Sequence, residues 1–154
     1  MKKITVILLI ILFISLVGCS SSSNKVLGLI EIGKSTRNDV AELNLEIEDT
    51  QVWDEEKGIY IYDYICDYAD YTLNNVEGTI YIRFSDYDNL VQFVNFSAEA
   101  TSENMEQLLS YLIDVYGKDY KEVDDYTTRW TSGNLIIDYV LTEDDTIEVR
   151  WYNE

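Results

Sequence analysis

The chain contains no histidine among its 154 residues. Histidine is the usual general base near neutral pH, and it completes the Ser/His and Cys/His arrangements of many hydrolases. It is also a common zinc ligand. Its absence argues against hydrolase chemistry, so we expect no enzyme activity, no metal and no cofactor.

Proline is also absent, and cysteine occurs only at positions 19 and 66. The lack of proline removes polyproline linkers and is consistent with a compact, regular unit. If Cys19 is chemically modified, Cys66 has no partner, so no intrachain disulfide can form and stability must come from packing. Cys66 lies in a strand-like stretch and is interpreted as a small buried hydrophobe.

Basic side chains are few. Lysine and arginine number 11 against 29 aspartate and glutamate residues, which gives a formal net charge of −18. Nucleic acids and anionic lipid surfaces are bound mainly through clusters of lysine and arginine. We therefore expect no nucleic-acid partner, whereas a basic protein would complement the acidic surface.

The N-terminal residues have the organisation of a secretory signal. Lys2 and Lys3 precede an apolar stretch from Ile4 to Val17, which is shorter than the ~20 residues of a membrane-spanning helix. The following Leu16-Val17-Gly18-Cys19 resembles the lipobox of bacterial lipoproteins. That resemblance implies cleavage before Cys19 and a diacylglyceryl group on its thiol.

This signal predicts three segments: a lipoprotein signal peptide at residues 1–18, a lipidated cysteine with a polar tether at 19–25, and a single α+β domain at 26–154. Lys2 and Lys3 would leave with the signal, so 29 acidic side chains would face 9 of the 11 basic ones, a formal charge of −20. The six tether residues 20–25 reach about 20 Å when extended. We expect the domain to lie close to the cell membrane, on its extracytoplasmic face, held by a palmitate-type lipid anchor on Cys19.

Apolar spacing predicts two helices and six strands. A short helix begins after Thr36 with Val40 and Leu43 on one face, and a longer one runs from about Glu103 to Tyr116, ending before Gly117. The predicted strands are 59–66, 79–85, 90–96, 126–131, 135–141 and 146–152. The order αβββαβββ indicates an α+β fold with an antiparallel sheet or sheets covered by two helices, and a structural duplication is one interpretation of it.

A second resemblance involves the start of the predicted domain. Ile32-Gly33-Lys34-Ser35, followed by Val40 and Leu43, is similar to the opening helix of two groups of small proteins. These are the bacterial lipoproteins of the outer-membrane-assembly type and the β-lactamase-inhibitor-like fold. The resemblance implies helix-plus-meander units and no functional residue.

Aromatic residues recur on one side of the predicted strands. Within 59–66 the tyrosines alternate with isoleucines, so a core-facing isoleucine set would place the tyrosines on an open face. Tyrosine combines rigid contact area with a hydroxyl and suits protein, peptide or sugar binding. The other interpretation is that tyrosine simply favours strands. The candidate ligand-binding residues are Tyr60, Tyr62, Tyr64, Tyr81, Arg83, Arg150 and Tyr152.

Two acidic stretches, 86–89 and 143–145, contain the oxygen ligands that calcium prefers. Neither has the glycine and terminal glutamate spacing of an EF-hand loop. Aspartate and asparagine are also common in hairpin turns for backbone reasons, and we favour this interpretation.

The sequence therefore predicts a membrane-anchored, extracytoplasmic lipoprotein that acts as a non-enzymatic binding or envelope-accessory module. Its partner would be a protein or peptide. The alternative is an inhibitor or immunity-type protein that blocks a basic envelope enzyme or toxin, for which the net charge of −18 would be suited.

Replacing the thiol of Cys19 tests the anchor. Cys19→Ser removes the only sulfur that could carry the lipid, so we expect the variant to leave the membrane fraction and to lose metabolic palmitate labelling. Cys66→Ser is the matched control and should keep both properties. Unchanged fractionation of the Cys19→Ser chain would instead indicate an uncleaved membrane anchor.

Overall fold

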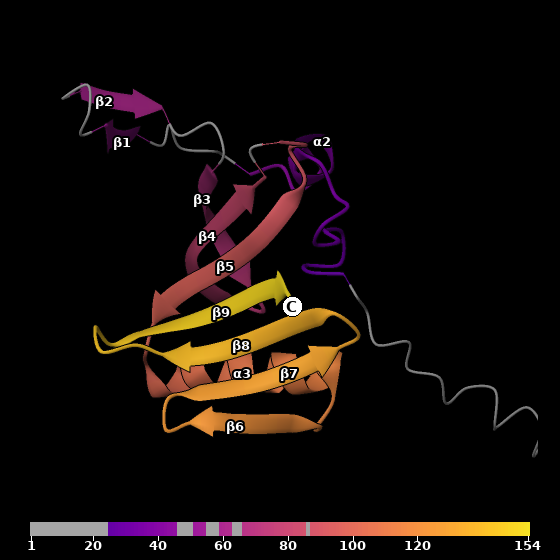
Figure 1. The fold of residues 1–154 in the computed structure, drawn as a ribbon. Helices are drawn as coiled ribbons and strands as arrows, with labels where there is room; N and C mark the ends of the chain where they lie inside the picture. The colour runs from indigo at the N-terminus through magenta and orange to yellow at the C-terminus, as the bar shows by residue number, and fades with distance from the viewer. Residues whose placement is uncertain (1–24, 46–50, 55–58, 63–65, 86) are drawn as a thin grey trace, which may run out of the picture.

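A computed structural model describes residues 25–45, 51–54, 59–62, 66–85 and 87–154. In these ranges the chain forms two α-helices, a seven-stranded antiparallel sheet and a separate two-stranded sheet (Figure 1). The α+β class and the antiparallel sheet predicted from the sequence are confirmed. Neither of the described helices is long and apolar enough to cross a membrane. Cys19 and the rest of the predicted signal lie outside the described residues.

The large sheet is built from two meanders that meet at its centre. Its strand order is β3-β4-β5-β9-β8-β7-β6, so β5 pairs with β9 across a long sequence separation. The helices are α2 (Arg37–Ala41) and α3 (Ser102–Tyr116). The strands are β1 (Gln51–Asp54), β2 (Ile59–Tyr62), β3 (Cys66–Leu73), β4 (Val76–Phe84), β5 (Val91–Glu99), β6 (Tyr120–Asp124), β7 (Thr127–Ser132), β8 (Leu135–Leu141) and β9 (Thr146–Asn153).

The predicted order αβββαβββ is wrong in detail, because five strands precede α3 and four follow it. The predicted strand 59–66 is not a single element: β2 ends at Tyr62 and belongs to the two-stranded sheet, whereas β3 begins at Cys66. Strand β6 was not predicted because all five of its residues are exposed, which leaves no apolar alternation to detect. A duplication of the two halves stays a prediction.

Helix α3 has the predicted ends. The side-chain oxygen of Thr101 accepts a hydrogen bond from the backbone N–H of Asn104 at 3.1 Å, which caps the first turn. Gly117 ends the helix with φ of 88°, a conformation that favours glycine. Leu108 and Leu112 are fully buried, so this face of the helix packs into the core.

Two buried tryptophans attach the C-terminal end of α3 to the sheet. The indole N–H of Trp130 on β7 donates to the backbone oxygen of Gly117 at 2.9 Å. The indole N–H of Trp151 on β9 donates to the hydroxyl of Tyr116 at 3.0 Å. Burial raises the pKa of the Tyr116 hydroxyl above its ordinary value, so this group stays protonated. Both large side chains are thereby buried with their polar atoms satisfied.

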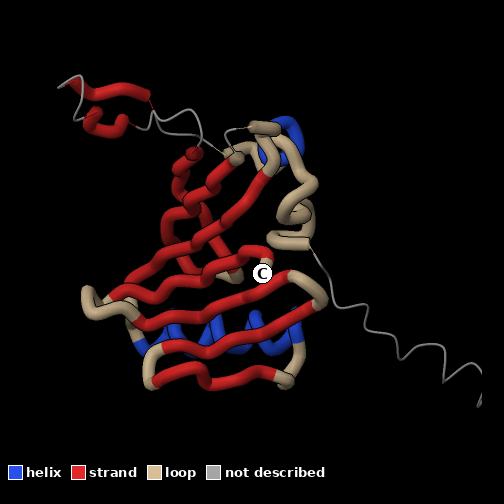
Figure 2. Tube along the Cα trace, viewed as in Figure 1, coloured by secondary structure: helices blue, strands red, loops and turns tan. Residues whose placement is uncertain are grey.

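Strand alternation divides the sheet into a core face and an open face. Ile82 on β4 lies opposite Val94 on β5, and Val94 lies opposite Trp151 on β9; all three are fully buried. The same core includes Val26 and Ile30 from the N-terminal segment. Figure 2 shows α3 behind the sheet, on one face only. Within the described ranges, the opposite face is therefore left without a helical cover.

Gly78 provides a test of the packing between β4 and β5. A Cβ atom at this position would lie 2.3 Å from the backbone oxygen of Ser97 and 2.7 Å from the ring of Phe96. We therefore expect Gly78→Ala to lower the free energy of unfolding by about 1–3 kcal/mol, measured by denaturant titration. Glu77→Ala, at the exposed neighbouring position, should change it by less than about 0.5 kcal/mol. Equal effects of the two substitutions would contradict this packing.

Candidate functional site

The register of the central strands places four of the sequence-predicted residues on the open face. Arg83 on β4 lies opposite Phe93 on β5, and Phe93 lies opposite Tyr152 on β9. Two residues further along β5, Asn95 lies opposite Tyr81 on β4 and opposite Arg150 on β9. Residues far apart in the sequence are thus brought to one surface by the pairing of β5 with β9.

A continuous row of aromatic rings crosses this face. The ring centroids of Tyr68 and Tyr81 are 4.7 Å apart, those of Tyr81 and Phe93 are 6.0 Å apart, and those of Phe93 and Tyr152 are 6.4 Å apart. These separations are typical of interacting aromatic pairs. We call these four residues the aromatic row. Phe93 was missed as a candidate, because apolar residues at positions 91, 93, 94 and 96 give no clean alternation and Val91, of the same parity, is buried.

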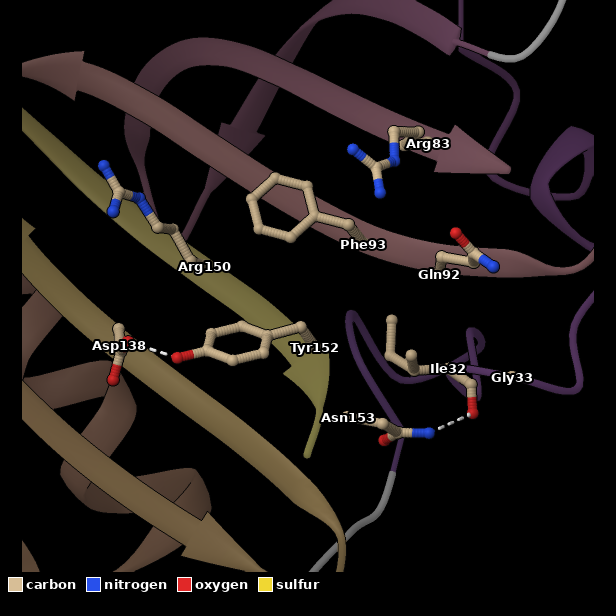
Figure 3. A pocket seen from close by; sticks show the side chains of 9 residues that line it. All are labelled: Ile32, Gly33, Arg83, Gln92, Phe93, Asp138, Arg150, Tyr152 and Asn153. Atoms are coloured by element: carbon tan, nitrogen blue, oxygen red, sulfur yellow. Dashed lines mark hydrogen bonds between the residues drawn. The ribbon is translucent and has the colours of Figure 1, made fainter. Parts of the chain in front are cut away.

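A cavity of about 650 Å³ opens beside the aromatic row (Figure 3). Its volume falls in the range of small-molecule and peptide sites. Phe93 and Tyr152 supply apolar surface, and Arg83 and Arg150 lie on either side of the Phe93 ring. The remaining walls come from the N-terminal segment, β5, β8 and β9. They are Ile32, Gly33, Gln92, Asp138 and Asn153.

Asp138 on β8 is the most deeply buried charged group of this face, with 5% of its surface exposed. Its two carboxylate oxygens accept hydrogen bonds from the Arg129 Nε and Nη2 atoms at 2.6 and 2.8 Å. The Tyr152 hydroxyl donates to Oδ2 at 2.7 Å and accepts from Arg129 Nη2 at 3.0 Å. Both Asp138 oxygens and the Tyr152 hydroxyl have partners, so the Tyr152 ring is held in one orientation beside the cavity.

The electrostatics of the network follow from these contacts. Burial alone would raise the pKa of Asp138, but the hydrogen bonds from Arg129 and Tyr152 and the charges of Arg129 and Arg150 lower it below its ordinary value. Burial and the bond to Asp138 raise the pKa of the Tyr152 hydroxyl. Asp138 is therefore ionised and Tyr152 neutral at neutral pH.

The two arginines that line the cavity, Arg83 and Arg150, differ in their partners. Arg150 is paired with Glu148 on the same strand, with Nη2 and Oε2 2.5 Å apart. Arg83 is exposed, and it makes no hydrogen bond or ion pair with any residue that the structure describes. Its guanidinium is therefore available to a ligand.

The N-terminal segment, residues 25–36, forms one rim of the cavity and is attached to the sheet by hydrogen bonds. The Asn153 side-chain N–H₂ donates to the backbone oxygen of Ile32 at 3.1 Å, and the backbone N–H of Gly33 donates to the oxygen of Val91 at 2.7 Å. Gly33 has φ of +79°, which favours glycine at this turn. This rim was not predicted, because nothing in the sequence links residues 32–33 to β9.

The remaining sequence-predicted residues lie elsewhere. Tyr60 and Tyr62 are in β2, which pairs only with β1 within the described residues. Tyr64 and Cys19 lie outside the described residues. The expected row of tyrosines along one strand is therefore replaced by a row across four strands, since the sequence alone does not show that β2 and β3 are separate elements.

The acidic turns have backbone roles in the described part of the chain. The Asp88 carboxylate accepts a hydrogen bond from the Leu90 N–H at 3.2 Å, and Asn89 and Asp145 have φ of 56° and 53°. Aspartate and asparagine tolerate such left-handed turns better than most residues. No group of three aspartate, glutamate or cysteine side chains gathers among these described residues in a way that could hold a metal ion.

No protein-family model and no curated protein sequence matches the chain. Among solved structures it is similar to YjgB, a DUF4309 family protein from Bacillus subtilis subsp. subtilis strain 168. The two share 16% sequence identity over 81% of this chain and 82% of that chain, with a TM-score of 0.44. At this level of similarity, function has to be inferred from the site itself.

The Asp138 network predicts a pH-dependent contribution to stability. Because the native pKa of Asp138 lies below its ordinary value of 3.8, the carboxylate stabilises the fold above about pH 4. This stabilisation is lost as the pH falls through the native pKa. We expect Asp138→Asn to cost about 1–3 kcal/mol of unfolding free energy at pH 7, measured by urea titration.

The difference in unfolding free energy between wild type and Asp138→Asn should then narrow as the pH falls below about 4, because Asp138 of the unfolded chain takes up its proton before Asp138 of the native protein does. Asp70→Asn removes the same charge from an exposed position on β3 and is the control. A difference that stays constant from pH 7 to pH 3 would contradict the assigned network.

Proposed function

We propose that the chain is a lipid-anchored, extracytoplasmic binding module that holds a protein or peptide partner on the open face of its sheet. The observation that carries this proposal is the aromatic row beside a cavity, on the face that α3 leaves uncovered. Partly exposed aromatic clusters of this kind are typical of binding surfaces, since their rings bury large apolar area at a small cost in conformational entropy.

The chemistry of the cavity favours binding over catalysis. Asp138 is its only carboxylate among the described lining residues, and both of its oxygens already accept hydrogen bonds. Its lowered pKa makes it a weak base, and the raised pKa of the Tyr152 hydroxyl makes that group a weak acid. Asp138 and Tyr152 are therefore better suited to fix the geometry of a binding surface than to transfer a proton.

The proposed anchor would keep this face near the membrane. Ile32, at the rim of the cavity, is 13 residues from Cys19 in the sequence. Even a fully extended segment of this length spans only about 45 Å. The partner would therefore be a component of the cell envelope that is accessible at the membrane surface.

A second candidate is the inhibitor or immunity-type protein, and the formal net charge of −18 favours it. Such a surface would accelerate association with a basic enzyme or toxin and would do so less at high salt. The identity of the partner separates the two candidates.

Site-specific photo-crosslinking tests the proposed face. A photo-reactive phenylalanine analogue at position 93 of the full-length chain should form a discrete adduct in cells, whereas one at Tyr87, which is 99% exposed in the β4–β5 connection, should not. We expect Tyr81→Ser to weaken the adduct at position 93 at least about fivefold, because it removes a ring of the aromatic row.

Tyr87→Ser is the matched control and should leave that adduct unchanged. The melting transition of each variant separates lost binding from lost folding. Adducts of equal yield at positions 93 and 87 would refute the open face as the binding surface. So would an adduct at position 93 whose yield is unchanged by Tyr81→Ser in a folded chain. A single basic enzyme or toxin in the adduct would favour the second candidate.

A further inference from the structure

The charges of the open face do not reflect those of the whole chain. Three of the four arginines, Arg83, Arg129 and Arg150, lie on this one face of the sheet. Arg129 is neutralised by Asp138, and Arg150 by Glu148. Arg83 is the cavity arginine that has no carboxylate partner among the described residues. A chain with a formal charge of −18 thus carries one uncompensated positive charge beside an aromatic surface.

We propose that the cavity selects a peptide segment that carries one carboxylate, which binds Arg83, next to an apolar side chain that packs on Phe93 and Tyr152. This inference rests on the proposed function and specifies its ligand. The guanidinium of arginine matches a carboxylate through two parallel hydrogen bonds. A cationic ligand is disfavoured here, because the uncompensated Arg83 lies beside the Phe93 ring.

The charge balance favours a single negative charge on the ligand. One uncompensated guanidinium can neutralise one carboxylate, whereas each additional negative charge meets the long-range repulsion of a chain with a formal net charge of −18. A phosphate dianion or a strongly acidic segment is therefore a poorer fit than a monoanion. The proposed selectivity is for charge and shape together.

The remaining polar groups of the cavity suit a peptide backbone. Gln92 on β5 is exposed and carries a side-chain amide that both donates and accepts hydrogen bonds. Asn153 donates one N–H to Ile32, which leaves its own carbonyl oxygen as an acceptor at the rim. These amides complement the N–H and C=O groups of an extended segment, and the volume of about 650 Å³ accommodates a few residues.

A pair of matched probes tests the charge selectivity. N-acetyl-Gly-Phe and its C-terminal amide differ by one carboxylate, and both can be titrated into the full-length chain in non-ionic detergent. Binding is followed through the NMR shifts of the side-chain amides of Gln92 and Asn153. We expect the acid to bind at least about fivefold more tightly than the amide, since a charge-assisted contact with a partly exposed arginine contributes about 1 kcal/mol.

Arg83→Gln should bring the acid to the affinity of the amide and leave the amide unchanged. The matched control is Arg37→Gln, which removes the same charge from α2, where Arg37 lies 4.3 Å from the centroid of Phe84. This variant should retain the preference for the acid. Arg83→Lys keeps the charge without the paired hydrogen bonds and should retain part of the preference.

The inference is overturned if the acid and the amide bind wild type equally, if neither shifts the cavity amides, or if Arg37→Gln acts as Arg83→Gln does. Tighter binding of phenyl phosphate than of N-acetyl-Gly-Phe would also overturn it, in favour of a phosphorylated ligand. Any of these results with an intact crosslink at position 93 refutes the ligand class alone. Loss of that crosslink specificity refutes the proposed function itself.

Discussion

The attachment of α3 to one face of the sheet determines the rest of the molecule. Leu108 and Leu112 bury the apolar side of the helix, while the indoles of Trp130 and Trp151 fix its C-terminal end by hydrogen bonds. Each buried indole N–H would be costly without a partner, so the position of the helix is closely specified. With only one long helix in the described chain, the opposite face has no helical cover, and its side chains must tolerate solvent or bind a partner.

That open face is organised by one buried carboxylate. Asp138 accepts hydrogen bonds from Arg129 and Tyr152, and these bonds connect β7, β8 and β9. A buried charge of this kind is costly unless all of its partners are present, which makes it more effective in specifying a geometry than in adding stability. The geometry it specifies is the orientation of Tyr152, the ring that ends the aromatic row and forms one wall of the cavity.

The parts of the fold that depend on local patterns could be predicted from the sequence. Strand 135–141 and helix 103–116 agree with β8 and α3 to within a residue, because each has a regular apolar period and a terminating turn. Strand β6 has no apolar period, so no local pattern indicates it. The isoleucines and tyrosines of 59–66 have the pattern of one strand, so the sequence does not indicate that β2 and β3 are separate.

The candidate site depends on register, which local patterns do not contain. The position of Phe93 between Arg83 and Tyr152 follows from the pairing of β5 with both β4 and β9. Asp138 likewise binds Arg129, which is 9 positions away in the sequence, and Tyr152, which is 14 positions away. In the sequence Asp138 is simply the polar member of an alternating strand. Tyr81, Arg83, Arg150 and Tyr152 could be chosen by parity, but their common surface emerges only from the assembled sheet.

The pairing of β5 with β9 also has a kinetic consequence. Phe93 and Tyr152 are 59 positions apart in the sequence, with α3 and three strands in the intervening chain, yet they lie on neighbouring strands. Contacts of such long sequence separation form slowly, because the entropy of loop closure opposes them until the intervening elements are ordered. We therefore expect the cavity to form after the local hairpins as the chain folds. A chain in which β5 and β9 have not yet paired would lack the cavity, because Phe93 and Tyr152 would not lie side by side.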